Sequence, residues 1–408
     1  MALLAIALLV RVLTDNRSSP GSHHSGRLNL SGVIAIVFIL LAVAMLARRG
    51  RGVLPAILAS LWLCIWTAIA LGTSGASTET LREGVREGSV IALAVIVYNL
   101  RGALTPTNAA RMLQFVGFVA AVIAVYQLAT DTGMDIAGNI RSNGTFAHPN
   151  SAAMFFAIGA GVSLWLYFEC DRRPIDVLLF ALFTTALLST YSVDGLAALI
   201  AMLIALGALR PGPLRSKGGP WLMAGLIVAI FLATPLGARR IARVNSPINA
   251  GANGSSLAWR VHKWKLLMPD WEGSPIIGRG LGTTTTEAGS PGDQYAGEPP
   301  HNEYVRYLVE SGVVGLAILL WAVTILIRRV LLRRRQWDGR APNTTALALL
   351  VIVGCLVNSL ADNTLLDSPT CYAAALIIAA LLSVPSIKPG ARSSALSRAG
   401  RRAAATYQ

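Results

Sequence analysis

Long apolar runs separated by short charged segments constrain the fold of this chain more than any other feature. Of its 408 residues, 54% are hydrophobic and 13% are charged, whereas soluble domains have about 25% charged residues. A helix that crosses the hydrocarbon core of a bilayer, roughly 30 Å thick, needs about 17 to 25 apolar residues. Runs of this kind recur along the chain, and no soluble core could bury so many. The sequence therefore predicts an all-α polytopic membrane protein.

The apolar runs predict about twelve transmembrane helices, the first, fourth and seventh of them short. No small-residue cleavage site follows residues 1–13, so this run is expected to be a short first span and not a signal peptide. The expected spans cover residues 1–13, 30–47, 53–72, 86–100, 109–129, 151–168, 175–190, 193–209, 220–236, 305–327, 344–361 and 370–385.

Basic residues in the connecting loops predict the orientation of the helices. Arginine and lysine groups follow residues 47, 168, 209 and 327, and twelve spans place all of them on one side of the membrane, together with both termini. Positively charged loops stay in the cytoplasm, so the termini and the basic tail, residues 386–408, are expected there. The net charge of +15 is thereby attributed to membrane orientation and not to nucleic-acid binding.

This orientation leaves three segments outside. Residues 73–87 are expected to form a short interfacial helix, and residues 130–150 a polar loop. The third, residues 237–304, separates transmembrane helices 1–9 (residues 1–236) from helices 10–12 (residues 305–385). Because it is far longer than a usual connection, the function is expected to lie there.

The long outer loop is basic, contrary to the usual bias of outer segments. Its cationic residues favour an anionic neighbour, which could be lipid headgroups or a substrate that bears a diphosphate. The planar fork of arginine suits phosphate oxygens, but the composition leaves both readings open. The basic residues are Arg239, Arg240, Arg243, Arg260, Lys263, Lys265 and Arg279.

Residues 256–271 (SLAWRVHKWKLLMPDW) have the periodicity of an amphipathic helix. Arg260 lies one turn before Trp264, along the apolar face that also holds Leu267 and Trp271. Tryptophan favours the membrane–water interface, so this helix is expected to hold Arg260 at the depth of a lipid diphosphate. A snorkelling surface arginine is the alternative.

Gly278, Gly280 and Gly282 form a glycine-rich run after this helix. The run lacks the strand–loop–helix context of phosphate-binding loops, so a turn is the better prediction. The four cysteines of the chain lie in or near apolar segments without metal-ligand spacing and are expected to be packing residues. No metal site is predicted.

The segment PPHNEY, residues 299–304, lies where the outer loop re-enters the membrane. Its two prolines fix an extended approach, after which His301 or Asn302 can cap the next helix. A histidine at this position can act as a general base near neutral pH, although most lone histidines are structural.

Three segments, in order along the chain, resemble the O-antigen ligase and polysaccharide polymerase superfamily. Residues 301–316 (HNEYVRYLVESGVVGL) are similar to its His-Asn signature, which ends in Glu-x-Gly-x-x-Gly. Residues 141–150 (RSNGTFAHPN) resemble its Gly-Thr-Phe…Pro-Asn stretch, and residues 259–282 its Arg…Trp…Ser-Pro…Gly-x-Gly stretch. The span layout with a long outer loop extends the likeness over the whole chain.

The resemblance implies a GT-C-like architecture and a metal-independent, inverting glycosyl transfer without a cofactor. The donor would be a glycan on a polyprenyl diphosphate, usually undecaprenyl, and the acceptor a lipid or polysaccharide at the outer face of the bacterial cytoplasmic membrane. A diphosphate leaving group needs charge stabilisation, and an acceptor hydroxyl needs a base. The signature does not separate a ligase from a polymerase.

The site residues follow from the same resemblance. Arg260 matches the diphosphate-binding arginine of the superfamily, and His301 matches its active-site histidine; both are expected to be catalytic. The residues expected to bind the substrate are Arg141, Arg239, Arg240, Arg243, Asn302, Glu303 and Tyr304.

One position departs from the superfamily pattern. A Ser-Arg-x-Gly element often stands at the outer start of a span, and its arginine contacts the donor phosphates. Here Val193 takes that arginine's place in Ser192-Val193-Asp194-Gly195, and a buried valine cannot replace a cation. Either Arg141 or one of Arg239, Arg240 and Arg243 replaces it, or the donor is bound differently.

Two other classes of function remain open. A transporter or flippase of lipid-linked oligosaccharide suits twelve spans, but it should have ionisable groups in mid-span, whereas the charge of this chain is concentrated in its loops. A relative that binds polyprenyl glycans without catalysis is compatible with Val193.

Overall fold

The computed structural model describes residues 1–15, 30–49, 52–73, 78–100, 103–136, 139–209, 214–233, 256–286, 298–334 and 342–384. Within these ranges the regular secondary structure is helical except for one antiparallel hairpin, β1 (Met134–Ile136) with β2 (Asn139–Arg141). The helices are α1 (Ala2–Leu13), α2 (Leu30–Arg49), α3 (Val53–Thr73), α4 (Thr78–Asn99), α5 (Pro106–Thr130), α6 (Pro149–Glu169), α7 (Pro174–Ser189), α8 (Val193–Leu209), α9 (Leu214–Ala233), α11 (Ser256–Gly273), α12 (Thr283–Thr286), α13 (Glu303–Arg334), α14 (Thr344–Asn358) and α15 (Ser368–Ser383).

Helix lengths agree with the predicted all-α membrane protein. In the described ranges five helices, α2, α3, α5, α6 and α13, are long and apolar enough to cross a membrane, and six shorter helices are apolar. The first half of α4 is charged, and its second half coincides with the predicted fourth span. Twelve crossings and a GT-C architecture stay predictions.

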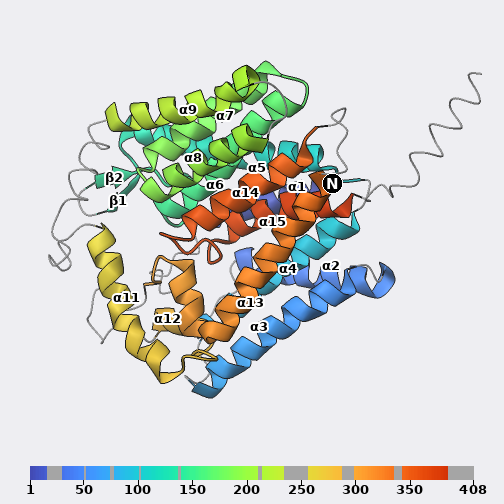
Figure 1. Cartoon of the computed structure of the whole chain (residues 1–408), viewed down its shortest axis with the longest axis vertical. Coiled ribbons are helices and arrows are strands. Elements are labelled where there is room, and N and C mark those ends of the chain that lie inside the picture. Colours follow the sequence, from blue (N-terminus) through green and yellow to red (C-terminus); the bar gives the residue numbers. More distant parts are fainter. Residues whose placement is uncertain are drawn as a thin grey trace, which may run out of the picture.

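Helix α6 lies at the centre of the bundle, against α5, α7, α8 and α14 (Figure 1). Small residues allow its close packing: a Cβ atom at Gly117 or at Gly159 would come within 2.9 Å of the Phe183 ring. Glycine at such contacts is typical of packed membrane helices. Trp165 is fully buried and donates a hydrogen bond to Asn343 O at 2.9 Å.

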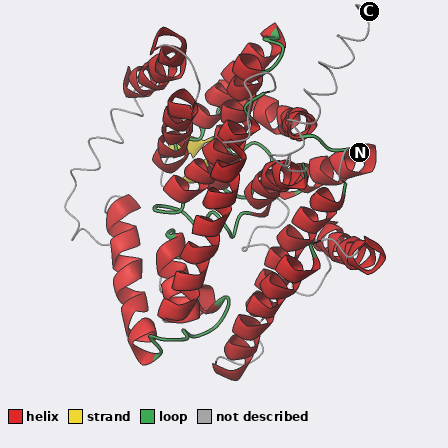
Figure 2. Cartoon of the chain, turned by 45° about the vertical axis from the view of Figure 1, so that its right-hand side comes forward, coloured by secondary structure: helices red, strands yellow, loops and turns green. Residues whose placement is uncertain are grey.

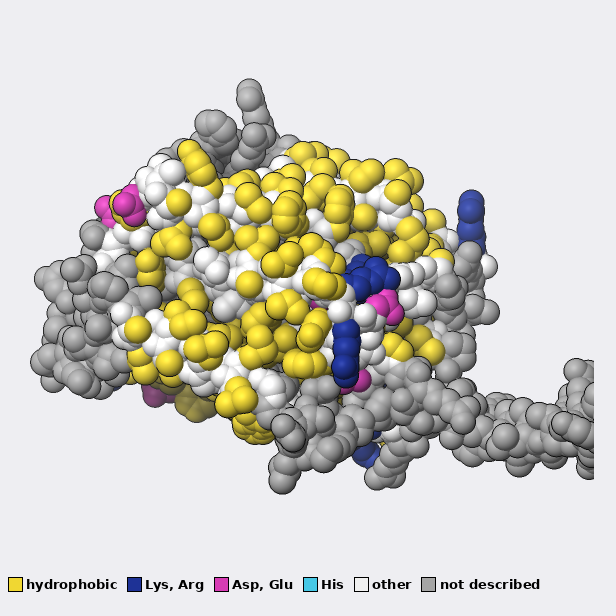
Figure 3. Space-filling model, turned by 90° about the horizontal axis from the view of Figure 1, so that it is seen from above, with side chains coloured by type: hydrophobic (Ala, Val, Ile, Leu, Met, Phe, Trp, Pro, Cys, Tyr) yellow, Lys and Arg dark blue, Asp and Glu magenta, His cyan; other side chains and the backbone are white. Residues whose placement is uncertain are grey.

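The outer surface of the bundle is apolar. Large hydrophobic side chains remain exposed on several helices, among them Leu40, Leu58, Leu222 and Trp321. Figure 3 shows one such face, with hydrophobic side chains over most of it and few charged groups. Hydrophobic surface of this extent is suited to lipid and not to water.

The charged segment that was expected to form a separate interfacial helix does not do so. Residues 78–87 are instead the first turns of α4, which continues without interruption to Asn99. Glu83 is 1% exposed, and it accepts a hydrogen bond from Arg306 of α13 at 3.0 Å. The charged residues of these turns predict a solvent-exposed segment, but the ion pair with Arg306 allows Glu83 to be buried.

Helix α13 is broken at Gly312, where φ is 65° and ψ is −172°. A Cβ atom there would lie 2.2 Å from Ile276 O, so glycine is required for the close approach of residues 274–282, the loop between α11 and α12 (Figure 2). This loop supplies the backbone partners that the break removes. The exchanged bonds are Arg279 N to Val309 O (3.0 Å), Gly280 N to Glu310 O (2.8 Å), Val313 N to Pro275 O (2.9 Å) and Val314 N to Ile276 O (3.2 Å).

The predicted turn at the glycine run is confirmed. Gly278, Gly280 and Gly282 have φ values of 72°, 102° and 82°, a region that favours glycine. A Cβ atom at Gly280 would lie 2.2 Å from the Ala70 backbone. The run therefore packs the loop between α3 and α13.

Candidate functional site

His301 is held by two neighbouring residues of the segment that follows α14. Its backbone N–H donates to Asn363 Oδ1 at 2.6 Å, and its ring Nδ1 lies 2.7 Å from Asp362 Oδ1. The backbone has a positive φ of 48°, which is strained for a residue other than glycine and persists only where its surroundings hold it. With Nδ1 bonded to the carboxylate, Nε2 is the nitrogen left for proton transfer.

Asp362 is suited to orient this ring. Burial acts to raise the pKa of Asp362, but the hydrogen bond from His301 and the charge of the protonated ring outweigh it and lower the pKa to about 2. The carboxylate is therefore ionised at neutral pH and can stabilise an imidazolium, as the aspartate of a catalytic triad does. Sequence analysis missed Asp362, which is 61 residues from His301 in the chain and in no recognisable motif.

Helix α11 brings Arg260 to the same end of the bundle. Trp259 packs its ring edge-on to His301, with centroids 5.4 Å apart, and Trp264 Nε1 donates to Pro300 O at 2.8 Å. The predicted apolar face packs Leu267 against Val309 of α13. These contacts fix α11 beside the start of α13.

Arg260 forms an ion pair with Asp194 in the first turn of α8. Its Nη2 lies 2.7 Å from Asp194 Oδ2 and its Nη1 lies 3.4 Å from Oδ1. The two side chains are 11% and 10% exposed. Val193, which was expected to be buried, is 47% exposed.

The loop that starts α6 completes this end of the bundle. His148 caps α6 by accepting a hydrogen bond from Asn150 N at 3.1 Å, and its ring centroid lies 6.3 Å from that of His301. Burial lowers the pKa of His148 to about 4, so this ring is neutral at physiological pH. We call the set Asp194, Arg260, His148, His301 and Asp362 the polar mouth.

Arg141 is 5% exposed and is connected to the polar mouth through Asn150, whose backbone N–H donates to His148. Its Nε donates to Thr190 O at 2.7 Å, and its Nη2 donates to Asn150 Oδ1 at 2.7 Å. These bonds connect β2 to the α7–α8 turn and to the start of α6. Arg239, Arg240 and Arg243 lie outside the described residues.

Asn302 and Tyr304 bond to the protein backbone at the start of α13. Asn302 caps the helix, because its Oδ1 accepts from Val305 N at 3.0 Å, and its Nδ2 donates to Leu360 O at 2.9 Å. The Tyr304 hydroxyl donates to Leu356 O at 3.1 Å. Both residues thus connect α13 to the end of α14.

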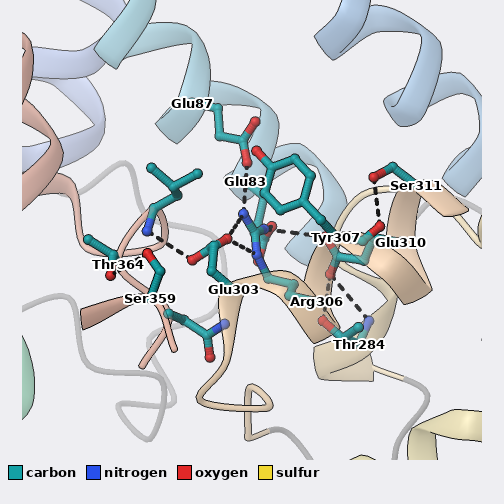
Figure 4. Close-up of polar contacts among 12 residues, drawn as sticks. Glu83, Glu87, Thr284, Glu303, Arg306, Tyr307, Glu310, Ser311, Ser359 and Thr364 are labelled. Carbon is teal, nitrogen blue, oxygen red and sulfur yellow. Dashed lines mark hydrogen bonds and ion pairs between the residues drawn. The ribbon is translucent and has the colours of Figure 1, made fainter. Parts of the chain in front are cut away.

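Glu303 belongs to a second, buried cluster around Arg306 (Figure 4). Arg306 is 0% exposed and meets four carboxylates and the Tyr307 ring, 4.9 Å from its Cζ. Glu303 is 1% exposed, and its Oε2 accepts from Leu365 N at 3.0 Å. The four pairs are Arg306 with Glu303 (2.6 Å), Glu83 (3.0 Å), Glu87 (3.3 Å) and Glu310 (3.3 Å).

The Arg306 cluster therefore joins α4 and α13 to residues 359–367, the segment that holds His301. Sequence analysis missed Arg306, although a signal was present. Glu303 and Glu310 lie three residues before it and four residues after it, and side chains at these spacings share one face of a helix.

Comparison with known families supports the sequence resemblance. A sequence model described as O-antigen ligase matches residues 178–320, a range that includes Asp194, Arg260, His301 and the break in α13 but not Arg141 or Asp362. No curated protein matches the chain. The match supports assigning residues 178–320 to the O-antigen ligase and polymerase superfamily.

Proposed function

We propose that the chain is an inverting glycosyltransferase that moves a glycan from a polyprenyl diphosphate to a hydroxyl group of a lipid or polysaccharide acceptor. The main support is that Arg260 and the His301–Asp362 pair lie together at the polar mouth, where Trp259, the neighbour of Arg260, contacts the His301 ring. A cation for the leaving group and a base for the acceptor are the two groups that this reaction needs.

In the proposed reaction His301 Nε2 accepts the proton of the acceptor hydroxyl as the hydroxyl oxygen bonds to the anomeric carbon. The bond from that carbon to the diphosphate oxygen breaks, and its electron pair leaves with the diphosphate. Arg260 stabilises the negative charge that develops on the leaving group. Attack opposite the leaving group inverts the anomeric configuration, and Asp362 stabilises the imidazolium that forms.

Arg306 and Glu303 act as positioning residues in this proposal. Glu303 holds Leu365 N, and Leu365 belongs to the same short segment as Asp362 and Asn363, which clamp His301. Arg306 in turn fixes the Glu303 carboxylate. The buried cluster thus sets the distance between α13 and the base-orienting aspartate without touching the substrate.

Transport of lipid-linked oligosaccharide is less well supported. A translocation path needs ionisable groups in mid-span. Among the described helices, Arg306 lies in the first turn of α13, Asp176 in the first turn of α7 and Glu83 in the charged first half of α4. Buried charge near helix ends favours chemistry at the membrane surface.

The direct test is glycan transfer by purified protein in lipid nanodiscs, with a polyprenyl-diphosphate oligosaccharide as donor. Arg260→Ala and His301→Ala should each lower kcat/KM by about 10²-fold or more. His262→Ala and Lys265→Ala are matched controls, because both side chains are exposed on α11, and they should retain near wild-type transfer. Transfer that persists in both site variants would contradict the assignment.

The proposal places the polar mouth outside the bacterial cytoplasmic membrane, with both termini in the cytoplasm. The distribution of the basic loops supports this orientation. A membrane-impermeant thiol reagent should label Ser290→Cys in intact cells when the four native cysteines are replaced by alanine. Labelling only after the membrane is opened would reverse the orientation.

A further inference from the structure

The guanidinium group of Arg260 has a partner in the protein. Asp194 faces the fork end-on, with one oxygen 2.7 Å from Nη2 and the other 3.4 Å from Nη1. Both side chains are about nine-tenths buried, so water screens the pair only weakly. A phosphate group would approach the same pair of N–H groups, because carboxylate and phosphate both bind the arginine fork with two oxygens.

Arg260 is the one cation among the five residues of the polar mouth when His301 is neutral, as a base must be, and the set also holds two carboxylates, Asp194 and Asp362. Arg260 faces Asp194, and Asp362 faces the His301 ring. Arg141, the second arginine in this region, is directed at Thr190 O and Asn150, and the neutral His148 ring adds no charge. A diphosphate placed beside an intact Arg260–Asp194 pair would therefore meet the Asp194 carboxylate as a like charge at close range.

Asp194 has support of its own when Arg260 turns away. It lies in the first turn of α8, where the helix dipole stabilises a negative charge. Ser192 caps the same turn by accepting a hydrogen bond from Gly195 N at 3.3 Å. Separating the pair therefore does not leave the carboxylate without stabilisation.

We propose that Asp194 is a built-in competitor of the donor: it occupies the fork of Arg260 in the donor-free protein, and the donor diphosphate must displace it. Asp194 thereby sets the donor concentration at which the site fills. This inference rests on the proposed function, because it takes Arg260 as the diphosphate contact.

The test measures binding of undecaprenyl diphosphate to the full-length protein in nanodiscs. Asp194→Asn keeps the shape of the side chain and removes its charge, so the Kd should fall about tenfold, a fraction of the full interaction between unit charges in contact. Asp194→Ser, suited to the first turn of a helix, should act in the same direction. Asp135→Asn removes an exposed charge of β1 and should leave the Kd within about twofold.

A double variant separates this inference from the proposed function. Arg260→Ala should raise the Kd, and Asp194→Asn should have no further effect in that background, because the competition acts through Arg260. In transfer assays Asp194→Asn should lower KM for the donor.

Each outcome decides one of the two claims. An unchanged or higher Kd in Asp194→Asn and Asp194→Ser, with binding still dependent on Arg260, would refute the competition and leave the proposed function intact. Binding that is equal in wild type and Arg260→Ala would instead refute Arg260 as the diphosphate contact and both claims with it.

Discussion

Two arginines near the start of α13 meet carboxylates in different ways. Among the described residues Arg260 pairs with Asp194, and both side chains keep about a tenth of their surface exposed. Arg306 is fully buried among four carboxylates (Figure 4). The guanidinium group of Arg260 is thus partly accessible to a ligand, whereas that of Arg306 has a structural role. Burial and the number of partners distinguish the two, whereas residue type does not.

The largest expected effect is on stability and comes from Arg306→Ala. Removing this guanidinium leaves four buried carboxylates without their common partner, and breaking a buried ion pair costs about 3–5 kcal/mol. The melting temperature in detergent should fall sharply, with loss of monodisperse protein. Arg260→Ala is the comparison and should cost less stability, because it leaves one partly exposed carboxylate without its partner instead of four buried ones. Similar stability losses in both variants would erase the distinction between the two arginines.

Asp362→Asn should affect turnover more than stability. The amide preserves the shape of the side chain but cannot stabilise an imidazolium, so kcat should fall on the order of 10²-fold. Asp362→Glu should restore part of the rate. A kcat close to wild type in Asp362→Asn would reduce Asp362 to a packing residue.

The polar mouth should also be sensitive to acid through His148. Burial lowers the pKa of His148 from 6.5 to about 4 in the folded protein, so protonation favours unfolding. Stability should fall as the pH drops below 6.5, and the loss should be complete below about 4, on the order of 3 kcal/mol in total.

Replacement of this ring gives the matched variant. His148→Asn keeps a side chain that can cap α6 but does not titrate. Unfolding measured between pH 7 and pH 4 should depend less on pH in this variant than in wild type. Parallel pH curves for the two proteins would show that His148 is not the acid-sensitive group.

The smallest effect is expected at Asn302. Loss of its cap in Asn302→Ala should cost about 1 kcal/mol of stability, and Asn302→Ser should recover most of it. Because Asn302 was predicted to bind substrate, the change in KM is informative. If KM rises in both variants while stability recovers in Asn302→Ser, the result would support a role of Asn302 in substrate binding.

Apolar runs specify where the helices lie, and these could be predicted. The expected span 151–168 corresponds to Pro149–Glu169, and 193–209 to Val193–Leu209, because length and hydrophobicity act locally. The charged turns of α4 could not be placed in the same way. Their burial depends on Arg306, which lies 223 residues from Glu83 in the chain.

The candidate site could be predicted only in part for the same reason. Arg260 and His301 were visible through motifs, whereas Asp194 and Asp362 are partners that only folding brings to them. Glu303 was visible in the motif but faces Arg306 and not the mouth. A motif identifies which residues matter, and the helix face on which each lies decides its role.

The broken helix α13 has a consequence for biogenesis. Its second half can enter the bilayer as an ordinary span, but its first half reaches its final form only with residues 274–282, which fill the break at Gly312. These residues precede α13 in the chain, so they are synthesised before the helix that they complete. They can fill the break only after α13 has been made, and the start of α13, which follows His301, therefore reaches its final form late in folding.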